Sequence, residues 1–452
     1  MSTPLRRRWP LLALLLLLAF AFQGLRGLWD PDEGRYTAVA LEMLDSGDWL
    51  HPRLHPELPH YTKPPLTYWA LAASLGLFGR HEWAARLPNA IAFFCTALLV
   101  AGLARRLGMP APEPAALVYA TTVLPFAAAN AVTTDTLLTL WETLAMWAFV
   151  AGWRTDLRHW PALCWLALGL AFLTKGPPGL LPLLALLLWL LHRRDYSRLG
   201  RLFSPVGLAV FAVTGLGWYL LVVQDTPGLL GYFLHKEVAG RILTAGHHRH
   251  GEWYGGLEVY VPTLVIGALP WWPLAWWYRR RHPASRETPE AIGPFLGYWF
   301  FVPLVVFMLA RSRLPLYLLP LFVPLVLLLY RALAPGFVGG TGPGLRLALA
   351  CALLLPLLRA AGAWLPAVAD GRRFAARLAV WTNPDLHEVL FVDTKPRYSL
   401  RFYLDLPVEQ VYWRHAPDAM RFRPPESLDR ELRRDRYPRL LLAQPGDTPA
   451  LE

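Results

Sequence analysis

Residues 292–331 read IGPFLGYWFFVPLVVFMLARSRLPLYLLPLFVPLVLLLYR. Two long apolar runs without charged residues flank the basic segment Arg311-Ser312-Arg313. A helix needs roughly 20 apolar residues to cross the hydrocarbon core of a bilayer, so each run is about long enough to span a membrane. This stretch therefore predicts two membrane helices joined by a tight basic loop.

The rest of the chain has a similar composition. Of its 452 residues 55% are apolar and 17% are charged, whereas a soluble domain carries about 25% charged residues. We therefore expect a polytopic α-helical membrane protein with about eleven transmembrane helices. The shorter apolar stretch 64–79 is expected to lie in the membrane interface or to form a re-entrant segment. The expected spans are 9–28, 83–103, 113–130, 135–153, 160–174, 178–192, 205–223, 255–278, 292–310, 314–331 and 345–364.

Arginine-rich loops predict how the chain is oriented. Alternate connections between the expected spans hold most of the arginines, beginning with Arg6, Arg7 and Arg8. Because cytoplasmic loops carry an excess of Lys and Arg, the N-terminus is expected in the cytoplasm of a multi-pass cell-membrane protein. The same reading accounts for the net charge of +12 without a nucleic-acid partner. Cleavage of the first apolar run as a signal peptide stays an open alternative.

The C-terminal segment 371–452 differs from the membrane domain expected over residues 1–370. It holds 26 of the 76 charged residues of the chain. Its three short β-rich runs alternate with helical patterns near 397–404 and 425–435, which predicts a small extracytoplasmic α/β domain with a parallel sheet. These runs are Val389–Val392, Val408–Tyr412 and Leu440–Leu442.

The first outer loop, residues 29–82, is dense in acidic, basic and aromatic residues. Asp30-Pro31 is typical of a helix cap followed by proline in the first turn. Apolar residues then recur at helical spacing, which predicts an amphipathic interfacial helix with Asp32 and Glu33 in its first turn. All four lysines of the chain fall on the outer side in this topology, where a cluster of cations suits a phosphate group.

Several motifs together resemble one family. Their order and spacing are similar to the polytopic glycosyltransferases that use polyprenyl-phosphate sugars, which include the lipid A aminoarabinose transferase and the protein O-mannosyltransferases. The resemblance covers nearly the whole chain and implies an extracytoplasmic transfer site. The motifs are PDEGRYTAVALEML (31–44), KPPLTYW (63–69), RLPNA (86–90), LTKGP (173–177), LPLYLLPLFVPL (314–325) and FYLDLPV (402–408).

The resemblance implies roles for individual residues. Asp32 corresponds to the catalytic carboxylate, with Glu33 beside it, and Lys63 to the residue that binds the lipid phosphate. Asp135 corresponds to a second acidic residue, although it also fits a helix cap. Candidates for the remainder of the lipid-phosphate site are Lys175, Arg241, Arg313 and Tyr317, and the further candidates are Tyr61, Glu237 and Glu142.

Two of these candidates and one cluster need separate comment. Glu237 and Arg241 match the acidic–basic spacing of a second outer loop, residues 224–254, which the family uses as a mobile segment. Glu142 lies two helical turns beyond Asp135 as an intramembrane carboxylate, a functional candidate by default. His247, His248 and His250 leave a divalent metal open, although their loop lacks a fixed ligand spacing. No other cofactor is indicated.

The expected reaction is transfer of a sugar from a polyprenyl-phosphate carrier to an extracytoplasmic lipid, glycan or protein. A carboxylate would take the proton of the attacking hydroxyl, and cations would neutralise the departing phosphate, which predicts inversion at the anomeric carbon. A flippase or other transporter of lipid-linked sugars is an alternative, but the chain lacks the internal repeat often seen in transporters. An outer-face polysaccharide ligase or polymerase is a second alternative.

Overall fold

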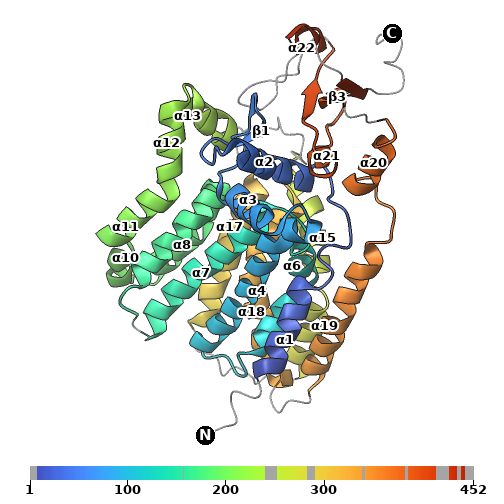
Figure 1. Ribbon diagram of the computed structural model, residues 1–452. Helices are drawn as coiled ribbons and strands as arrows, with labels where there is room; N and C mark the ends of the chain where they lie inside the picture. The colour runs from blue at the N-terminus through green and yellow to red at the C-terminus, as the bar shows by residue number, and fades with distance from the viewer. Residues whose placement is uncertain are drawn as a thin grey trace. The chain divides into compact units, whose positions relative to one another are not determined.

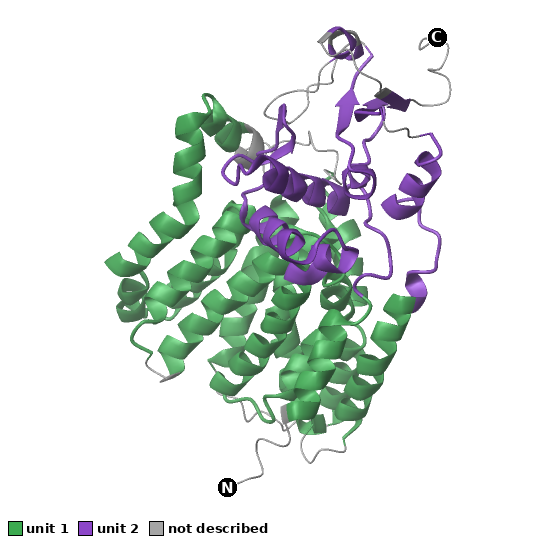
Figure 2. Cartoon of the chain, in the orientation of Figure 1, with its two compact units in different colours: residues 1–22, 89–360 green, residues 23–88, 361–452 purple. Residues whose placement is uncertain are grey.

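A computed structural model of the chain describes residues 8–155, 157–239, 252–281, 291–337, 342–381, 385–413, 427–434 and 439–442. The described chain is mostly helical and forms two compact units (Figures 1 and 2). Unit 1 comprises residues 1–22 and 89–360, and unit 2 comprises residues 23–88 and 361–452. This division differs from the predicted boundary near residue 371, because the first outer loop packs with the C-terminal segment in unit 2.

Unit 1 is a bundle of apolar helices. Of the described residues, five helices are long and apolar enough to cross a membrane, or six if one bent pair counts as a single span. The predicted number of eleven spans therefore stays a prediction. Its longer elements are α1 (Arg8–Phe20), α4 (Glu82–Arg106, which begins in unit 2), α7 (Thr134–Thr155), α8 (Trp160–Lys175), α9 (Leu181–His192), α12 (Gly217–Asp225), α15 (Gly255–Gly267), α16 (Trp271–Arg281), α17 (Ile292–Leu309), α18 (Phe322–Leu333) and α19 (Pro343–Gly362).

Short elements connect these helices. They include α5 (Pro114–Ala120), α6 (Val123–Ala128), α10 (Tyr196–Leu202), α11 (Pro205–Phe211) and α13 (Leu229–Gly231), the 3₁₀ turns η1 (Pro177–Leu180), η4 (Pro315–Leu321) and η5 (Ala334–Phe337), and the π-helical segments η2 (Ala212–Leu216) and η3 (Tyr232–Ala239).

Two expected spans are interrupted in the structure. The stretch 113–130 forms two short helices, α5 and α6, because the chain leaves the helix at Thr121 and Thr122. The stretch 255–278 bends by 70° between α15 and α16. Pro270 lies at this bend, where its ring and missing N–H prevent a continuous helix.

Aromatic side chains form the centre of unit 1. The ring of Phe149 meets Trp160 and Trp189 edge-on, at 5.4 and 5.8 Å between ring centroids, and stacks on Phe295 at 6.0 Å. Gly152 lets α7 and α8 approach closely, because a Cβ at this position would lie 2.1 Å from the Trp160 ring. This packing fixes the two helices that carry Asp135 and Lys175.

Unit 2 combines the first outer loop with a small α/β fold. Its sheet has the order β4-β3-β5 with parallel neighbours, and Val389 pairs with Val408 on one side and Leu440 on the other. The strands thus lie where the three β-rich runs predict them. The elements of unit 2 are α2 (Asp32–Ser46), β1 (Arg53–His55), β2 (Leu58–Pro59), α3 (Leu66–Phe78), α20 (Gly371–Leu378), β3 (Glu388–Val392), α21 (Ser399–Leu404), β4 (Val408–Val411), α22 (Leu428–Arg434) and β5 (Arg439–Leu442).

Candidate functional site

Helices α2 and α3 lie side by side at their first turns. The rings of Tyr36 and Tyr68 are 5.6 Å apart between centroids, and both side chains are buried. Tyr36 lies one turn after Asp32, and Tyr68 follows Lys63 by five residues. The helix pair therefore brings the segments that carry the predicted base and the predicted phosphate-binding lysine into one region of unit 2.

Asp32 presents a carboxylate to solvent at the start of α2. Its side chain is 50% exposed and forms an ion pair with Arg35, one turn along the same helix. The Arg35 guanidinium in turn lies 5.6 Å from the centre of the Tyr36 ring. The first turn of a helix carries a partial positive charge, which favours an acidic side chain at this position. Asp32 is thus an accessible, oriented carboxylate.

Glu33, the next residue, has the opposite environment. Its side chain is 4% exposed and accepts two hydrogen bonds from Arg86, at 3.0 Å each. It also accepts bonds of 2.6 and 3.1 Å from Arg26 and one of 2.7 Å from the Trp29 N–H. Burial alone would raise the pKa of Glu33, but the two guanidinium groups outweigh burial and lower the pKa to about 2. Both carboxylate oxygens are thereby committed to the protein itself.

Arg86 is the centre of this arrangement and was not among the predicted site residues. It is fully buried and also donates to the carbonyl oxygens of Gln23, Arg26 and Gly27, at 2.7, 3.0 and 2.8 Å. The RLPNA motif contained this arginine, and a cation at the start of an apolar run requires a buried partner. An arginine at the start of an apolar run is therefore the sequence feature that could have identified this site.

The predicted cap at Asp30 is wrong. Helix α2 begins at Asp32, and no side chain of the described residues caps its N-terminus. Asp30 instead accepts hydrogen bonds from the Ser399 N–H, at 3.1 Å, and from the Ser399 hydroxyl, which ties the loop to α21. Burial raises the pKa of Asp30 to about 6, although the bonds from Ser399 oppose this rise. Sequence could not show a partner so distant in the chain.

Lys63 and Tyr61 lie in the turn between β2 and α3. Lys63 is half-buried, and Tyr61 is buried with 4% exposure. The turn is held by a 2.8 Å hydrogen bond between Thr62 and His60, and the His60 ring meets the Tyr68 ring at 6.2 Å. Pro64 and Pro65 follow Lys63 directly, so the backbone at the start of α3 is restricted. The lysine therefore projects from a fixed turn.

A second cluster of candidates lies in unit 1. Asp135, in the first turn of α7, forms an ion pair with Lys175 at the end of α8, and both side chains are 8% exposed. The Lys175 ammonium group lies 4.3 Å from the centre of the Tyr317 ring, which is a cation–π distance. Glu142 is buried two turns further along α7 and lies in the electrostatic field of both charged residues. The structure thus brings four of the predicted residues together.

Arg313 is buried near the start of η4. Its guanidinium donates to the carbonyl oxygens of Glu252 and Met308, and the Met308 bond is 3.1 Å long. Arg241, His247, His248 and His250 lie outside the described residues, as does the side chain of Glu237, whose backbone is part of η3. Arg313 therefore anchors the segment before α15 through the Glu252 carbonyl.

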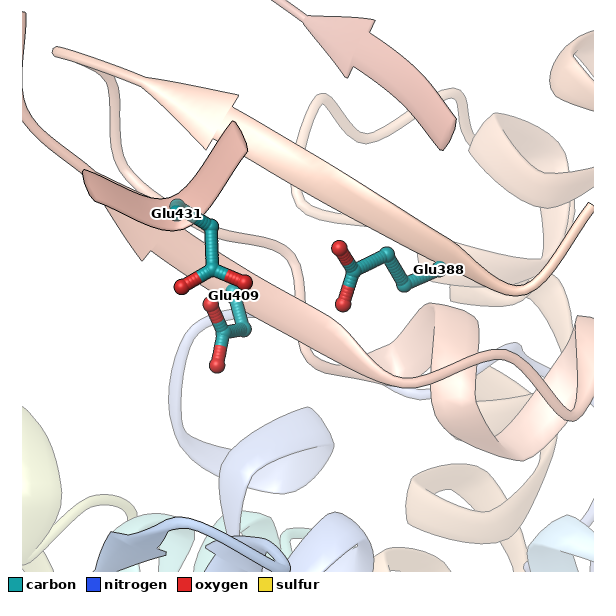
Figure 3. Close-up of side chains that lie close together, drawn as sticks. All are labelled: Glu388, Glu409 and Glu431. Atoms are coloured by element: carbon teal, nitrogen blue, oxygen red, sulfur yellow. The ribbon is translucent and has the colours of Figure 1, made fainter. Parts of the chain in front are cut away.

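Among the described residues of unit 2, three carboxylates lie close enough together to hold a metal ion. One oxygen each of Glu388, Glu409 and Glu431 lies within 4.8 Å of the others, and Figure 3 shows the three side chains converging. Glu409 also pairs with His55 at 2.9 Å. Carboxylate oxygens suit hard cations such as Mg²⁺ and Ca²⁺. The group involves none of the predicted metal-binding histidines.

Comparisons with known proteins give consistent results. Residues 62–218 match the family described as dolichyl-phosphate-mannose-protein mannosyltransferase. The chain is 35% identical over 343 residues to the undecaprenyl phosphate-alpha-4-amino-4-deoxy-L-arabinose arabinosyl transferase 2 of Pseudomonas fluorescens, which is 73% of this chain and 60% of that protein. The corresponding transferase of Edwardsiella ictaluri is 34% identical over 67% of this chain and 55% of its own length. The chain thus spans little more than half the length of these relatives.

The fold also has a solved counterpart. The crystal structure of ArnT from Cupriavidus metallidurans bound to undecaprenyl phosphate matches with a TM-score of 0.81 and 25% sequence identity. The match covers 100% of this chain and 95% of that protein. An oligosaccharyltransferase from Archaeoglobus fulgidus matches more distantly, with a TM-score of 0.52 and 14% identity, which shows a likeness of fold alone.

Proposed function

From the premise that the chain is a relative of the undecaprenyl-phosphate aminoarabinose transferases, in sequence and in fold, we propose that it is a membrane glycosyltransferase. It moves a sugar from a polyprenyl-phosphate carrier to an acceptor on the extracytoplasmic face. The names of the relatives favour undecaprenyl phosphate as the carrier and 4-amino-4-deoxy-L-arabinose as the sugar. The acceptor is a lipid, a glycan or a protein.

The different exposure of Asp32 and Glu33 supports the assignment of Asp32 as the general base. A general base needs a lone pair that an acceptor hydroxyl can reach. Asp32 is half exposed and has one side-chain partner among the described contacts, Arg35, whereas Glu33 accepts five hydrogen bonds in a buried site. We therefore assign catalysis to Asp32 and a structural role to Glu33.

Cations complete the proposed chemistry. Cleavage of the bond to the anomeric carbon leaves negative charge on the carrier phosphate, and a positioned ammonium group stabilises that charge. Lys63 is the proposed ligand of the carrier phosphate, because it lies in a fixed turn next to the helix that carries Asp32. Lys175, with Asp135 and Tyr317, forms a second cationic position in unit 1. Direct displacement with a single carboxylate predicts inversion of the anomeric centre.

The test is a transfer assay with the purified full chain. The donor panel contains undecaprenyl-phosphate aminoarabinose and prenyl-phosphate hexoses, the acceptor is a lipid A preparation, and products are identified by mass. We expect transfer of the amino sugar, its loss in Asp32→Asn and Lys63→Ala, and full activity in the controls Glu57→Gln and Lys395→Ala, which change exposed residues of the same unit. Movement of the donor across a vesicle membrane without transfer would favour the flippase.

A further inference from the structure

A cavity of about 640 Å³ lies in unit 1 at the C-terminal ends of α4 and α7. Its volume is typical of ligand pockets in proteins. The cavity is separate from the Asp135–Lys175 cluster, because Arg154 lies 19 residues after Asp135 on α7, roughly 28 Å along the helix axis. Its residues take no part in the proposed transfer reaction. We call it the basic cavity, and it is lined by Gly102, Arg105, Arg106, Gly108, Trp147, Trp153 and Arg154.

Three guanidinium groups and two indole rings line the basic cavity, and none of its described lining residues is acidic. One of the three, Arg105, also pairs at 2.7 Å with Glu113, which lies outside the lining. Arg106 lies 4.4 Å above the Trp147 ring, and Arg154 lies 5.6 Å from the Trp153 ring. Arg154 also donates to the Arg106 carbonyl at 3.2 Å. These contacts orient the guanidinium groups, whose forked donors match the oxygens of a phosphate.

The two glycines are required by this geometry. A Cβ at Gly102 would lie 2.8 Å from the Trp147 indole nitrogen, so glycine lets that ring pack directly on α4. Gly108 has φ of +71°, in the left-handed region that favours glycine, and it ends the turn after α4. The cavity is therefore built by the backbone as well as by its charged residues.

An accessible apolar stripe leads to the basic cavity along α4. Ile91 and Leu98 are 45% and 38% exposed, and Gly102 and Arg105 continue the same helical face at spacings of four and three residues. On α7, half-buried side chains at Trp141, Leu144 and Trp147 approach the cavity in the same way. The surface thus changes from apolar to basic along the length of two membrane helices.

We propose that the basic cavity binds the phosphodiester headgroup of an anionic membrane phospholipid, with the acyl chains along the stripe on α4. Basic pockets between membrane helices on the cytoplasmic side favour anionic headgroups, and Trp is enriched at membrane interfaces. The predicted topology places Arg105, Arg106 and Arg154 on the cytoplasmic side. A zwitterionic headgroup should bind more weakly, because the arginines repel its positively charged group. A soluble phosphate should also bind more weakly, because it has no acyl chains to pack on the apolar stripe.

Lipid retention measured by native mass spectrometry tests the proposal. The full chain is purified, equilibrated with phosphatidylglycerol or phosphatidylcholine, and compared with the variant Arg105→Gln/Arg106→Gln/Arg154→Gln. We expect the wild type to retain phosphatidylglycerol and the triple variant to bind it roughly tenfold more weakly. If the triple variant does not fold, Arg105→Gln alone, which changes a half-exposed side chain, must show a smaller loss.

The matched control removes three other arginines at a helix end. Arg279, Arg280 and Arg281 close α16, and Arg280 and Arg281 lie 3.9 and 4.4 Å from tryptophan rings, but none of them lines the basic cavity. Their replacement by glutamine should leave lipid retention unchanged. Equal losses in both triple variants would show a general charge effect and overturn the proposal. Displacement of the lipid by millimolar glycerol phosphate would overturn the lipid assignment in favour of a soluble phosphate.

Discussion

Replacing Glu33 by glutamine tests whether this residue holds the first outer loop together. The substitution keeps the shape of the side chain and removes its negative charge. In the folded chain it leaves Arg86, which is fully buried, and Arg26 beside a neutral amide. An amide also offers one oxygen acceptor in place of the two carboxylate oxygens that now accept five hydrogen bonds.

Two routes give the same magnitude for the loss of folding free energy. The pKa of Glu33 is lowered from its ordinary 4.5 to about 2, which corresponds to about 3 kcal/mol at neutral pH. Removal of one partner from a buried ion pair typically costs about 3–5 kcal/mol. Because the folded-state pKa is lowered, this stabilisation is present above pH 4.5 and is lost as the pH falls toward 2.

Thermal unfolding of the purified chain in lipid nanodiscs, followed by tryptophan fluorescence, measures this loss. For a unit of about 150 residues, 3 kcal/mol corresponds to a decrease in Tm of roughly 6–12 °C. The matched control is Asp32→Asn, the same change at the adjacent position. Its ion pair with Arg35 joins a half-exposed carboxylate to a guanidinium that is 27% exposed, so its loss should cost less than that of the fully buried Glu33 contacts, about 1–2 kcal/mol.

The two neighbouring variants should therefore differ in stability and in activity. Glu33→Gln should show the larger decrease in Tm and keep measurable transfer activity while folded, whereas Asp32→Asn should show the smaller decrease in Tm and lose transfer. An unchanged Tm together with lost activity in Glu33→Gln would refute the structural role and restore Glu33 as a catalytic candidate.

Three further changes give separate tests. The pKa of Asp30 is raised to about 6, so the protonated side chain stabilises the folded state. This stabilisation is fully present below pH 3.8 and is lost as the pH rises through 6. The Tm of the wild type should therefore fall more between pH 5 and 7 than the Tm of Asp30→Asn. In a double-mutant cycle, Asp135→Asn and Lys175→Met should each cost about 3–5 kcal/mol, and the double variant should cost at least about 1 kcal/mol less than their sum; strict additivity would exclude the ion pair. Tyr403→Phe removes hydrogen bonds to the Leu28 N–H and Glu82, so chemical unfolding should show a loss of about 1–3 kcal/mol, and an unchanged midpoint would contradict these bonds.

The sequence predicted what depends on local composition and period. Uncharged runs such as 292–310 correspond closely to a helix, α17, because an apolar segment in lipid must satisfy its backbone internally. The β-rich runs near Val389, Val408 and Leu440 correspond to the three parallel strands, since strands buried on both faces read as continuous apolar runs. The resemblance to polyprenyl-phosphate-dependent glycosyltransferases is confirmed by the relatives found.

Features that depend on distant contacts escaped prediction. The residues Asp32 and Glu33 look equivalent in the sequence. The contacts of Glu33 with Arg26 and with Arg86, which lies 53 residues later, distinguish the buried carboxylate from the exposed one. The role of Asp30 likewise depends on Ser399, 369 residues away. Helix interruptions near Thr121 and Pro270 were missed because hydropathy averages over a window and does not register where the backbone turns.

Paired measurement of donor binding and single-turnover transfer tests the central claim most directly. In the proposed reaction Asp32 removes the proton of the acceptor hydroxyl, and Lys63 binds the carrier phosphate. Asp32→Asn should therefore bind undecaprenyl-phosphate sugar with the wild-type Kd and fail to transfer it, and Lys63→Ala should lose donor affinity. Wild-type turnover in Asp32→Asn, or an unchanged Kd in Lys63→Ala, would contradict the account.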